Sequence, residues 1–348
     1  MRSVAYASVL TQVYSLLNLV AADVTAADKT KLNAFIQRRA REAFQKHWWA
    51  ETMRSEERWF RGFYATGTTY AAPTATTATE VFHPGSKAYF QSLRAGTGNA
   101  PATFAAGSWT TNTAYWAPIA ENYTGQDWAD ATVYAVGDTV RSLDDARYYR
   151  CFTAHTSSGS IDTAKFGLLS EWIPTISLDQ SGKTAMGLVR GCFVDNPERE
   201  SAPRRLKSLL GSSGVHLLDN TFSSVWVWFQ IKAPILTGAD WAAGPSYAVG
   251  DVVYYASATS GFEGDYWLCL TATSAGQDPE DTPAKWQRQE IPEALRDAIA
   301  HAAYSDYLRP VGKDGAVPLE STAGGQFLTD ELFKAVAMQR QAGRWAQG

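Results

Sequence analysis

The chain has 348 residues, of which 19% are charged and 13% are aromatic, and its formal net charge is −4. This length is sufficient for two or three domains, and the aromatic content favours β-structure and large contact surfaces over disorder. The negative charge argues against a protein that coats nucleic acid through a wholly basic surface. No stretch is long and apolar enough to span a membrane. The cysteines are far apart and form no CxxC pair, so no disulfide framework is expected: Cys151, Cys192 and Cys269.

Residues 1–64 are expected to form N-terminal helices. Apolar residues near helical spacing over 3–20 favour an amphipathic helix over a signal peptide. Thr25 then caps a second helix, with Asp28 three residues later as its capping-box partner. One face of this helix is basic, and the other is the predicted buried face, with Leu32, Ile36, Ala40, Ala43, Phe44 and His47.

An internal repeat dominates the middle of the chain. Residues 127–140, DWADATVYAVGDTV, return 113 residues later at 240–253 as DWAAGPSYAVGDVV, with nine identical positions. Each copy continues with a Gly-Asp turn, a short apolar run and an aromatic pair followed by cysteine, which predicts a small antiparallel β unit. A tryptophan is expected to close each unit, Trp172 in the earlier copy and Trp286 in the later one.

The two clear copies define β modules at 121–176 and 237–291, and a degenerate β module is expected at 65–120. There Tyr70 and Trp116 follow the same order without the Gly-Asp pair. The intervening segment, residues 177–236, contains a strongly predicted strand at 225–231.

Residues 292–348 are expected to form C-terminal helices that pack with residues 1–64. Pro292 is placed at the first position of a helix, and a last helix is expected from about Thr329. The predicted fold class is therefore α+β. A discontinuous helical domain combines both ends of the chain, with two or three small β modules and further antiparallel β-strands between them. The first of these C-terminal helices has an apolar stripe of Leu295, Ala298, Ile299 and Ala302.

The repeated order of Trp, Tyr, Gly-Asp, Val, aromatic pair and Trp resembles the small chitin-type carbohydrate-binding modules. This resemblance implies three-stranded units with a few surface aromatic rings that can cover the apolar face of a sugar. A unit this short must also build its own core, so most of its rings are expected to be buried. The candidate contacts with a glycan or with another subunit are Trp128, Trp241, Tyr134 and Tyr247, and the two tryptophans are the best candidates for exposed platforms.

A second resemblance concerns the whole chain. Two N-terminal helices that end in Trp48-Trp49 and the ERWFR segment at 57–61 resemble head-to-tail adaptor proteins of tailed bacteriophages, as do the VDNPE turn at 194–198 and the VWVWFQIKAP strand at 225–234. The resemblance implies a structural protein of the virion neck, made in the host cytoplasm. It also implies a homo-oligomer, a dodecameric ring that binds the portal protein and tail or tail-terminator (nozzle) proteins. DNA would only pass through its channel, and no membrane is involved.

No catalytic constellation is recognisable in the sequence. The five histidines are scattered without ligand spacing, and no phosphate-binding loop is present. The acidic clusters Asp144-Asp145 and 278–281 lie where turns are expected. We therefore expect no catalytic residue, no metal site and no cofactor, and the chain is not expected to be an enzyme. The alternative function is a carbohydrate-binding protein, or the non-catalytic glycan-binding part of a tail or secreted polysaccharide-active assembly.

Overall fold

The computed structural model describes residues 3–47, 49–73, 79–120, 122–170, 172–180, 183–218, 223–257, 262–309 and 322–334. The protein is α+β: helices from both ends of the chain form one bundle, and small, mainly antiparallel sheets lie between them in the sequence. The exceptions are the parallel pairs β10-β12 (Gln126–Asp127 with Thr139–Arg141) and β22-β23 (Ala239–Asp240 with Val252–Ser257). The chain divides into two compact units. The first comprises Met1–Arg54, Ser181–Leu188 and Phe229–Gly348, and the second comprises Ser55–Gln180 and Val189–Trp228.

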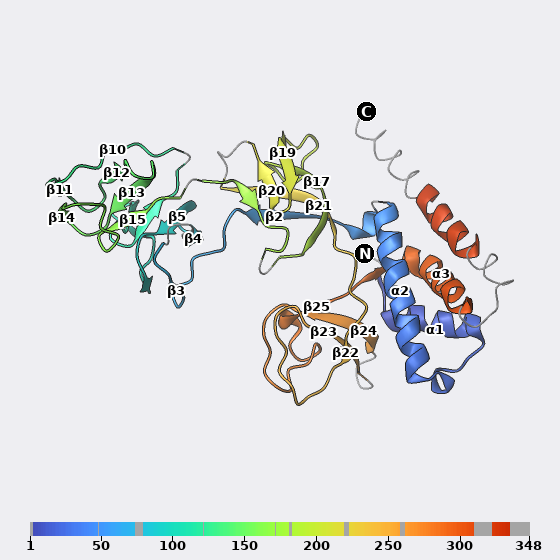
Figure 1. Ribbon diagram of the computed structural model, residues 1–348. Helices are drawn as coiled ribbons and strands as arrows, with labels where there is room; N and C mark the ends of the chain where they lie inside the picture. The colour runs from blue at the N-terminus through green and yellow to red at the C-terminus, as the bar shows by residue number, and fades with distance from the viewer. Residues whose placement is uncertain are drawn as a thin grey trace. The chain divides into compact units, whose positions relative to one another are not determined.

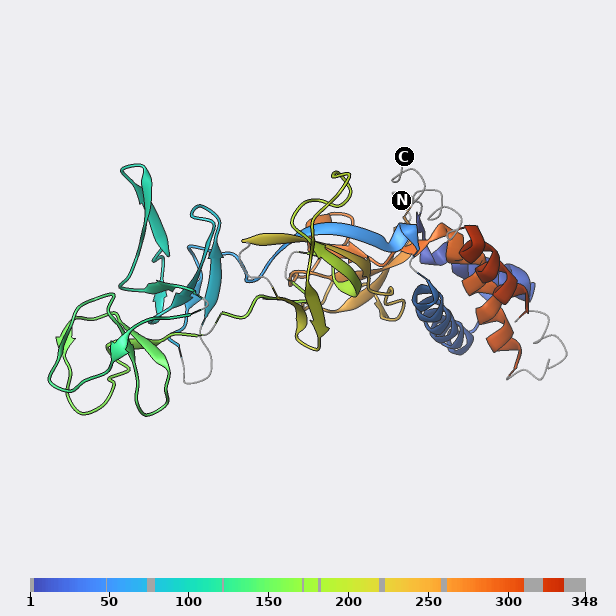
Figure 2. The same ribbon diagram turned by 90° about the horizontal axis from the view of Figure 1, so that it is seen from above.

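The helical bundle belongs to the first unit, where α1 and α2 from the N-terminal region lie against α3 from the C-terminal region (Figures 1 and 2). Thr25 caps α2 as predicted, because its Oγ1 accepts a hydrogen bond from the backbone N of Asp28 at 3.1 Å. The predicted apolar face of α2 is buried in the core, whereas His47 is half-buried beyond the helix end. The helices are α1 (Tyr6–Leu17), α2 (Ala26–Lys46), α3 (Arg296–Leu308) and a fourth helix at 322–334.

The fourth helix differs from the prediction, because it includes Gly324 and Gly325 before the expected start at Thr329. Glycine is unfavourable inside a helix by about 1 kcal/mol. Here the missing side chain permits close packing, since a Cβ at Gly324 would lie 3.0 Å from the backbone N of Ala302 on α3. Tertiary contact therefore overrides local propensity at this position.

The predicted helix start at Pro292 is also wrong. Pro292 has extended backbone angles and belongs to β26 (Ile291–Pro292), which pairs antiparallel with β1 (Ser3–Val4). A 3-10 turn, Glu293–Leu295, then leads into α3. The two strands thus join residues from opposite ends of the chain before the helices begin.

Three small β modules are present, which we call copy 1 (62–119), copy 2 (125–169) and copy 3 (238–289). Copy 3 belongs to the first unit, and copies 1 and 2 belong to the second. Copy 1 has sheets β4-β5-β9, β3-β6 and β7-β8; copy 2 has β10-β12-β13-β15 and β11-β14; copy 3 has β22-β23-β24-β25. Their bounds are β3 Thr69–Tyr70, β4 Glu80–His83, β5 Ala88–Ser92, β6 Gly96–Thr97, β7 Ala102–Ala105, β8 Ser108–Thr111, β9 Trp116–Pro118, β10 Gln126–Asp127, β11 Val133–Tyr134, β12 Thr139–Arg141, β13 Tyr148–Cys151, β14 His155–Thr156, β15 Phe166–Leu168, β22 Ala239–Asp240, β23 Val252–Ser257, β24 Phe262–Cys269 and β25 Trp286–Arg288.

The other strands form two further sheets. Most of the sheet β18-β17-β21-β2 and all of β16-β20-β19 belong to the second unit. The strand predicted at 225–231 is confirmed as β21, in which Val225, Val227 and Phe229 alternate as fully buried residues. The bounds are β2 Met53–Trp59, β16 Thr175–Ile176, β17 Met186–Phe193, β18 Arg205–Leu206, β19 Ser208–Gly211, β20 Gly214–Leu217 and β21 Ser224–Ile231.

Candidate functional site

A tyrosine fixes the same loop in each of the three β modules. In copy 2 the Tyr134 hydroxyl accepts a hydrogen bond from the backbone N of Ala129 at 2.9 Å and donates one to the carbonyl of the same residue at 3.4 Å. Because one side chain satisfies both backbone groups, the loop closes without a regular strand. The same pair of bonds joins Tyr70 to Ala65 in copy 1 and Tyr247 to Ala242 in copy 3.

The ring of this tyrosine packs edge-on against a second aromatic residue. The ring centroids are 5.4 Å apart for Tyr134 and Phe166, and 5.5 Å apart for Tyr247 and Trp286. In copy 1 the equivalent pair is Tyr70 and Trp116, at 5.1 Å. Such edge-to-face pairs add to the burial of the rings, so this contact forms the centre of each module.

The repeated Gly-Asp pair has a local structural role. Gly137 and Gly250 have φ angles of 101° and 97°, a backbone conformation that favours glycine. The next residue closes the turn: the backbone N of Ala135 donates to Asp138 Oδ2 at 2.7 Å, and in copy 3 Asp251 accepts the equivalent bond. The motif is therefore explained by turn geometry.

The expected closing tryptophan is wrong for copy 2. Trp286 pairs with Cys269 on β24, and the residue that pairs with Cys151 on β13 is Phe166. Trp172 instead lies outside the module and contacts Phe60, with ring centroids 5.3 Å apart. The sequence pattern gave the wrong residue because Phe166 and Trp172 are both aromatic and both follow the same polar loop.

The two tryptophans proposed as platforms are half-buried and pack against the cores of their own modules. The ring of Trp241 is perpendicular to that of Tyr255, with centroids 5.5 Å apart. Both indole nitrogens, in Trp128 and Trp241, are shielded from solvent and have no hydrogen-bond partner among the described residues. Of the two candidate tyrosines, Tyr134 is fully buried and Tyr247 is half-buried. The rings are thus integral parts of the modules.

The outer face of the copy 3 sheet contacts the helical bundle. Tyr266 lies edge-on to Tyr6 of α1, with ring centroids 4.9 Å apart. Beside it the buried Asp265 accepts a hydrogen bond from the backbone N of Tyr6 at 2.6 Å and pairs with Arg288 at 2.6 Å. Module and bundle therefore share one core within the first unit.

Copies 1 and 2 contact each other through a buried amide within the second unit. The fully buried Gln91 donates from Nε2 to the carbonyl of Leu168 at 2.9 Å, and its Oε1 accepts from the backbone N of Ser170 at 2.8 Å. The contact is close, because a Cβ at Gly167 would lie 2.8 Å from the carbonyl oxygen of Leu93. This seam joins the two copies.

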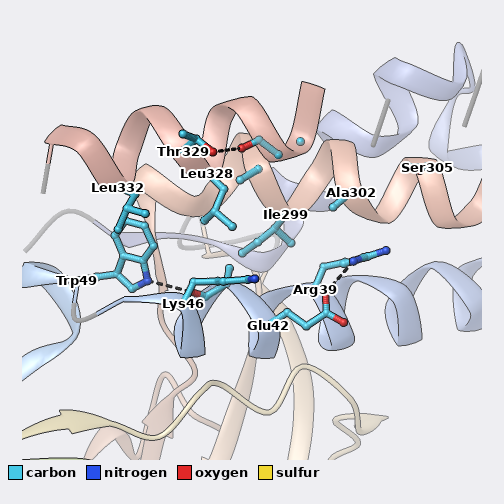
Figure 3. Close-up of a pocket in the computed structure, with 14 residues that line it drawn as sticks. Arg39, Glu42, Lys46, Trp49, Ile299, Ala302, Ser305, Leu328, Thr329 and Leu332 are labelled. Atoms are coloured by element: carbon cyan, nitrogen blue, oxygen red, sulfur yellow. Dashed lines mark hydrogen bonds and ion pairs between the residues drawn. The ribbon is translucent and has the colours of Figure 1, made fainter. Parts of the chain in front are cut away.

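A groove of about 470 Å³ lies between α2, α3 and the fourth helix (Figure 3). We call it the helical groove. Ile299, Leu328 and Leu332 provide apolar surface, and Leu332 lies over the ring of the buried Trp49. Its polar residues on α2 are Arg39, Glu42 and Lys46.

Two arginines hold α3 to α2 beside this groove. Asp306 is 3% exposed and accepts bonds from Arg39 Nε and Nη2, both at 2.7 Å, while Arg38 Nη2 lies 2.5 Å from its Oδ2. Burial acts to raise the pKa of Asp306, but the hydrogen bonds from Arg39 and Arg38 outweigh it and hold the pKa below its usual value. The carboxylate is therefore ionised at neutral pH.

The acidic clusters have tyrosine partners within their own modules. Asp145 accepts a hydrogen bond from the hydroxyl of Tyr149 at 2.7 Å. In copy 3, Asp278 and Glu280 both accept from Tyr255, and burial together with these carboxylates raises the pKa of that phenol to about 12. Within the described ranges, no group of three or more His, Cys, Asp and Glu side chains is placed to hold a metal ion.

The three cysteines are free and buried. Burial raises the pKa of the Cys192 thiol to about 11. Burial likewise raises the thiol pKa of Cys151 and Cys269, and each of these thiols donates to the carbonyl two residues later, at 3.2 and 3.1 Å. Ser92 makes the same bond in copy 1, to Arg94 at 2.8 Å. The cysteines thus have the character of packing residues.

Comparison with known proteins gives no assignment. No protein-family model matches the chain, and no curated protein matches its sequence. Among the residues that the structure describes, no helix is both long and apolar enough to cross a membrane. The residues that sequence reasoning missed are those of the helical groove and of the seam between copies 1 and 2, because each set comes from segments far apart in the chain.

Proposed function

We propose that the chain is a structural virion protein, a head-to-tail adaptor that joins the portal ring to the tail in a tailed bacteriophage. The observation that supports this most directly is the helical bundle built from both ends of the chain, with an open, partly apolar groove. A groove of this kind suits a segment of a partner protein. On the fourth helix Phe327 is 39% exposed and Phe333 is 70% exposed, so both rings are accessible to a partner that occupies the groove.

In this proposal the subunits form a homo-oligomer, a dodecameric ring on the portal protein, and contact tail or tail-terminator proteins at the other side. The protein is made in the host cytoplasm and resides at the virion neck. DNA passes through the ring channel. No catalytic role is proposed, and none of the acidic clusters is needed for the activity.

The second candidate is a carbohydrate-binding role for the repeated modules. Three copies of one aromatic-rich module favour it. Two observations weigh against it: Trp128 and Trp241 pack against their own modules, and the outer face of copy 3 contacts α1. A subunit contact is the better role for the surface around Trp128 and Trp241.

The adaptor role is tested by co-expression with the portal protein encoded by the same genome, followed by affinity capture. The wild-type chain should be retained by the portal. Phe333→Ser should weaken retention at least about tenfold, because it removes an exposed ring without opening the core. The matched control is Leu143→Ser, which removes an apolar side chain that is 69% exposed in copy 2. If the portal does not retain the wild-type chain, the proposal is wrong. If Phe333→Ser is retained as well as the wild type, the fourth helix is not part of the interface with the portal.

A further inference from the structure

A second cavity, of about 430 Å³, lies at the seam where copies 1 and 2 pack together. Arg94 and Leu93 line it from copy 1, and Tyr149, Phe152 and Thr153 line it from copy 2. Both copies belong to the same unit, and the buried Gln91 and the close approach at Gly167 hold them together beside the cavity. The volume falls within the range of about 300–1,000 Å³ that is typical of ligand pockets.

Arg94 supplies the charge of this cavity. Its guanidinium lies 3.8 Å from the ring centroid of Tyr115 and 5.9 Å from that of Phe152. Its Nε is shielded from solvent. Among the described residues this Nε has no hydrogen-bond partner and no carboxylate lines the cavity. A guanidinium held by aromatic rings is positioned in advance to pair with a carboxylate, here through the terminal edge formed by Nη1 and Nη2, because Nε is shielded.

The cation is specific to copy 1. Arg94 follows Ser92 by two residues, and the same position is Thr153 in copy 2 and Thr271 in copy 3. The fold of the module therefore does not require an arginine at this position. The arginine of copy 1 indicates a contact that exists only at the seam between copies 1 and 2.

The other residues that line the cavity indicate which kind of molecule would have this carboxylate. The rings of Tyr149 and Phe152 offer apolar faces, and the hydroxyls of Thr153 and Thr163 can donate and accept hydrogen bonds. Asp145 is outside the lining and is already paired with the Tyr149 hydroxyl. An apolar wall, neutral hydroxyls and one cation match a sugar ring that has a carboxylate.

We propose that the seam between copies 1 and 2 is a binding site for an acidic sugar, a hexuronate unit of an anionic polysaccharide, with Arg94 pairing to the carboxylate. The site is independent of the adaptor role, because it uses neither the helical groove nor the fourth helix. Failure of either proposal leaves the other standing.

Titration of the full chain with glucuronate, followed by isothermal calorimetry or by protein NMR, tests this site. Glucuronate should bind at least about tenfold more tightly than glucose, and added salt should weaken it. Arg94→Gln should weaken glucuronate binding about ten- to a hundredfold, since it removes a charge-assisted bond. The matched control is Arg141→Gln, a half-exposed arginine of copy 2 outside the cavity, which should bind as the wild type does.

The variant Arg94→Lys distinguishes a role of Arg94 in ligand binding from a role in stability, because lysine keeps the charge and the aliphatic stem but lacks the planar guanidinium. It should melt at the wild-type temperature and bind glucuronate several-fold more weakly. Three results overturn the proposal: no binding of glucuronate by the wild type, equal binding of glucuronate and glucose, or equal binding by the wild type and Arg94→Gln. Acetate that binds as tightly as glucuronate overturns the sugar assignment.

Discussion

Asp306 of α3 accepts two hydrogen bonds from Arg39 of α2, from Nε and Nη2, each at 2.7 Å. This pair joins residues that are 267 positions apart and closes the helical bundle between the two ends of the chain. The carboxylate is buried, whereas the side chains of Arg39 and Arg38 are 27% and 52% exposed. Loss of Asp306 therefore removes charge-assisted hydrogen bonds between the helices and leaves arginines that water can reach.

Replacement of this carboxylate should therefore destabilise the bundle. Asp306→Ala is expected to lower the free energy of unfolding by about 2–3 kcal/mol, measured by urea denaturation with far-UV circular dichroism. Asp297→Ala is the matched control on the same helix. Its ion pair with Arg296 is more than one-third exposed on both sides, so the loss should be below about 1 kcal/mol. Similar losses for the two variants would contradict the role given to Asp306.

The same carboxylate predicts a pH dependence. Because its pKa is lower in the folded than in the unfolded chain, its contribution is complete above the unfolded-state value of about 3.9 and is lost as the pH falls through the folded-state value. Urea midpoints measured from neutral pH downward should fall in that acid range. Asp306→Asn should be less stable at neutral pH and should show a smaller fall. A parallel fall in both proteins would assign the acid loss to other groups.

Substitution of Trp241 tests whether the aromatic rings of the modules stabilise the fold or bind a glycan. Trp241→Ala should lower the stability by about 2–3 kcal/mol, less than the 3–5 kcal/mol of a fully buried tryptophan, because the ring is half-buried. Trp241→Phe should cost less than about 1.5 kcal/mol, since it keeps most of the packing and removes an indole N–H without a partner. Thermal unfolding measures both. An alanine variant of unchanged stability that no longer binds chitin would identify Trp241 as a glycan platform.

The absence of a side chain at Gly238 should be essential to the stability of copy 3. A Cβ at this position would lie 2.1 Å from the carbonyl oxygen of Val252, so Gly238→Ala must displace backbone and should cost about 3 kcal/mol or more. Gly244 lies in the same module with nothing within 4 Å of its added Cβ, and Gly244→Ala should change stability by less than about 1 kcal/mol. The same clash occurs in copy 2 at Gly125 against Thr139, at 2.4 Å. Equal stability of the Gly238 and Gly244 variants would show that the repeated glycine has no steric role.

Sequence reasoning found the features that depend on local chemistry. The capping pair Thr25 and Asp28, the buried face of α2 and strand β21 all follow from residue type and spacing, and the structure confirms them. The repeat was evident because nine positions are identical. These signals are local, so a single stretch of sequence contains them.

The packing of the helices from the two ends of the chain was predicted, and the structure confirms it. Other features that depend on contacts between distant segments were missed. The fourth helix includes Gly324 because α3 accommodates it, and Phe166 replaces the expected Trp172 because strand register, and not residue type, decides which ring faces Cys151. The degenerate module was expected, but its strongest evidence, the paired hydrogen bonds of Tyr70 to Ala65, is a matter of geometry. Both cavities likewise combine residues from separate segments, so no local pattern could indicate them.

Cryo-electron microscopy of the assembled particle tests most directly whether this chain occupies the neck of a phage virion. We expect density for the helical bundle in a ring of the same symmetry as the portal, in contact with both the portal and the tail. Particles that contain the protein at another location, or as a single asymmetric copy, would contradict this expectation.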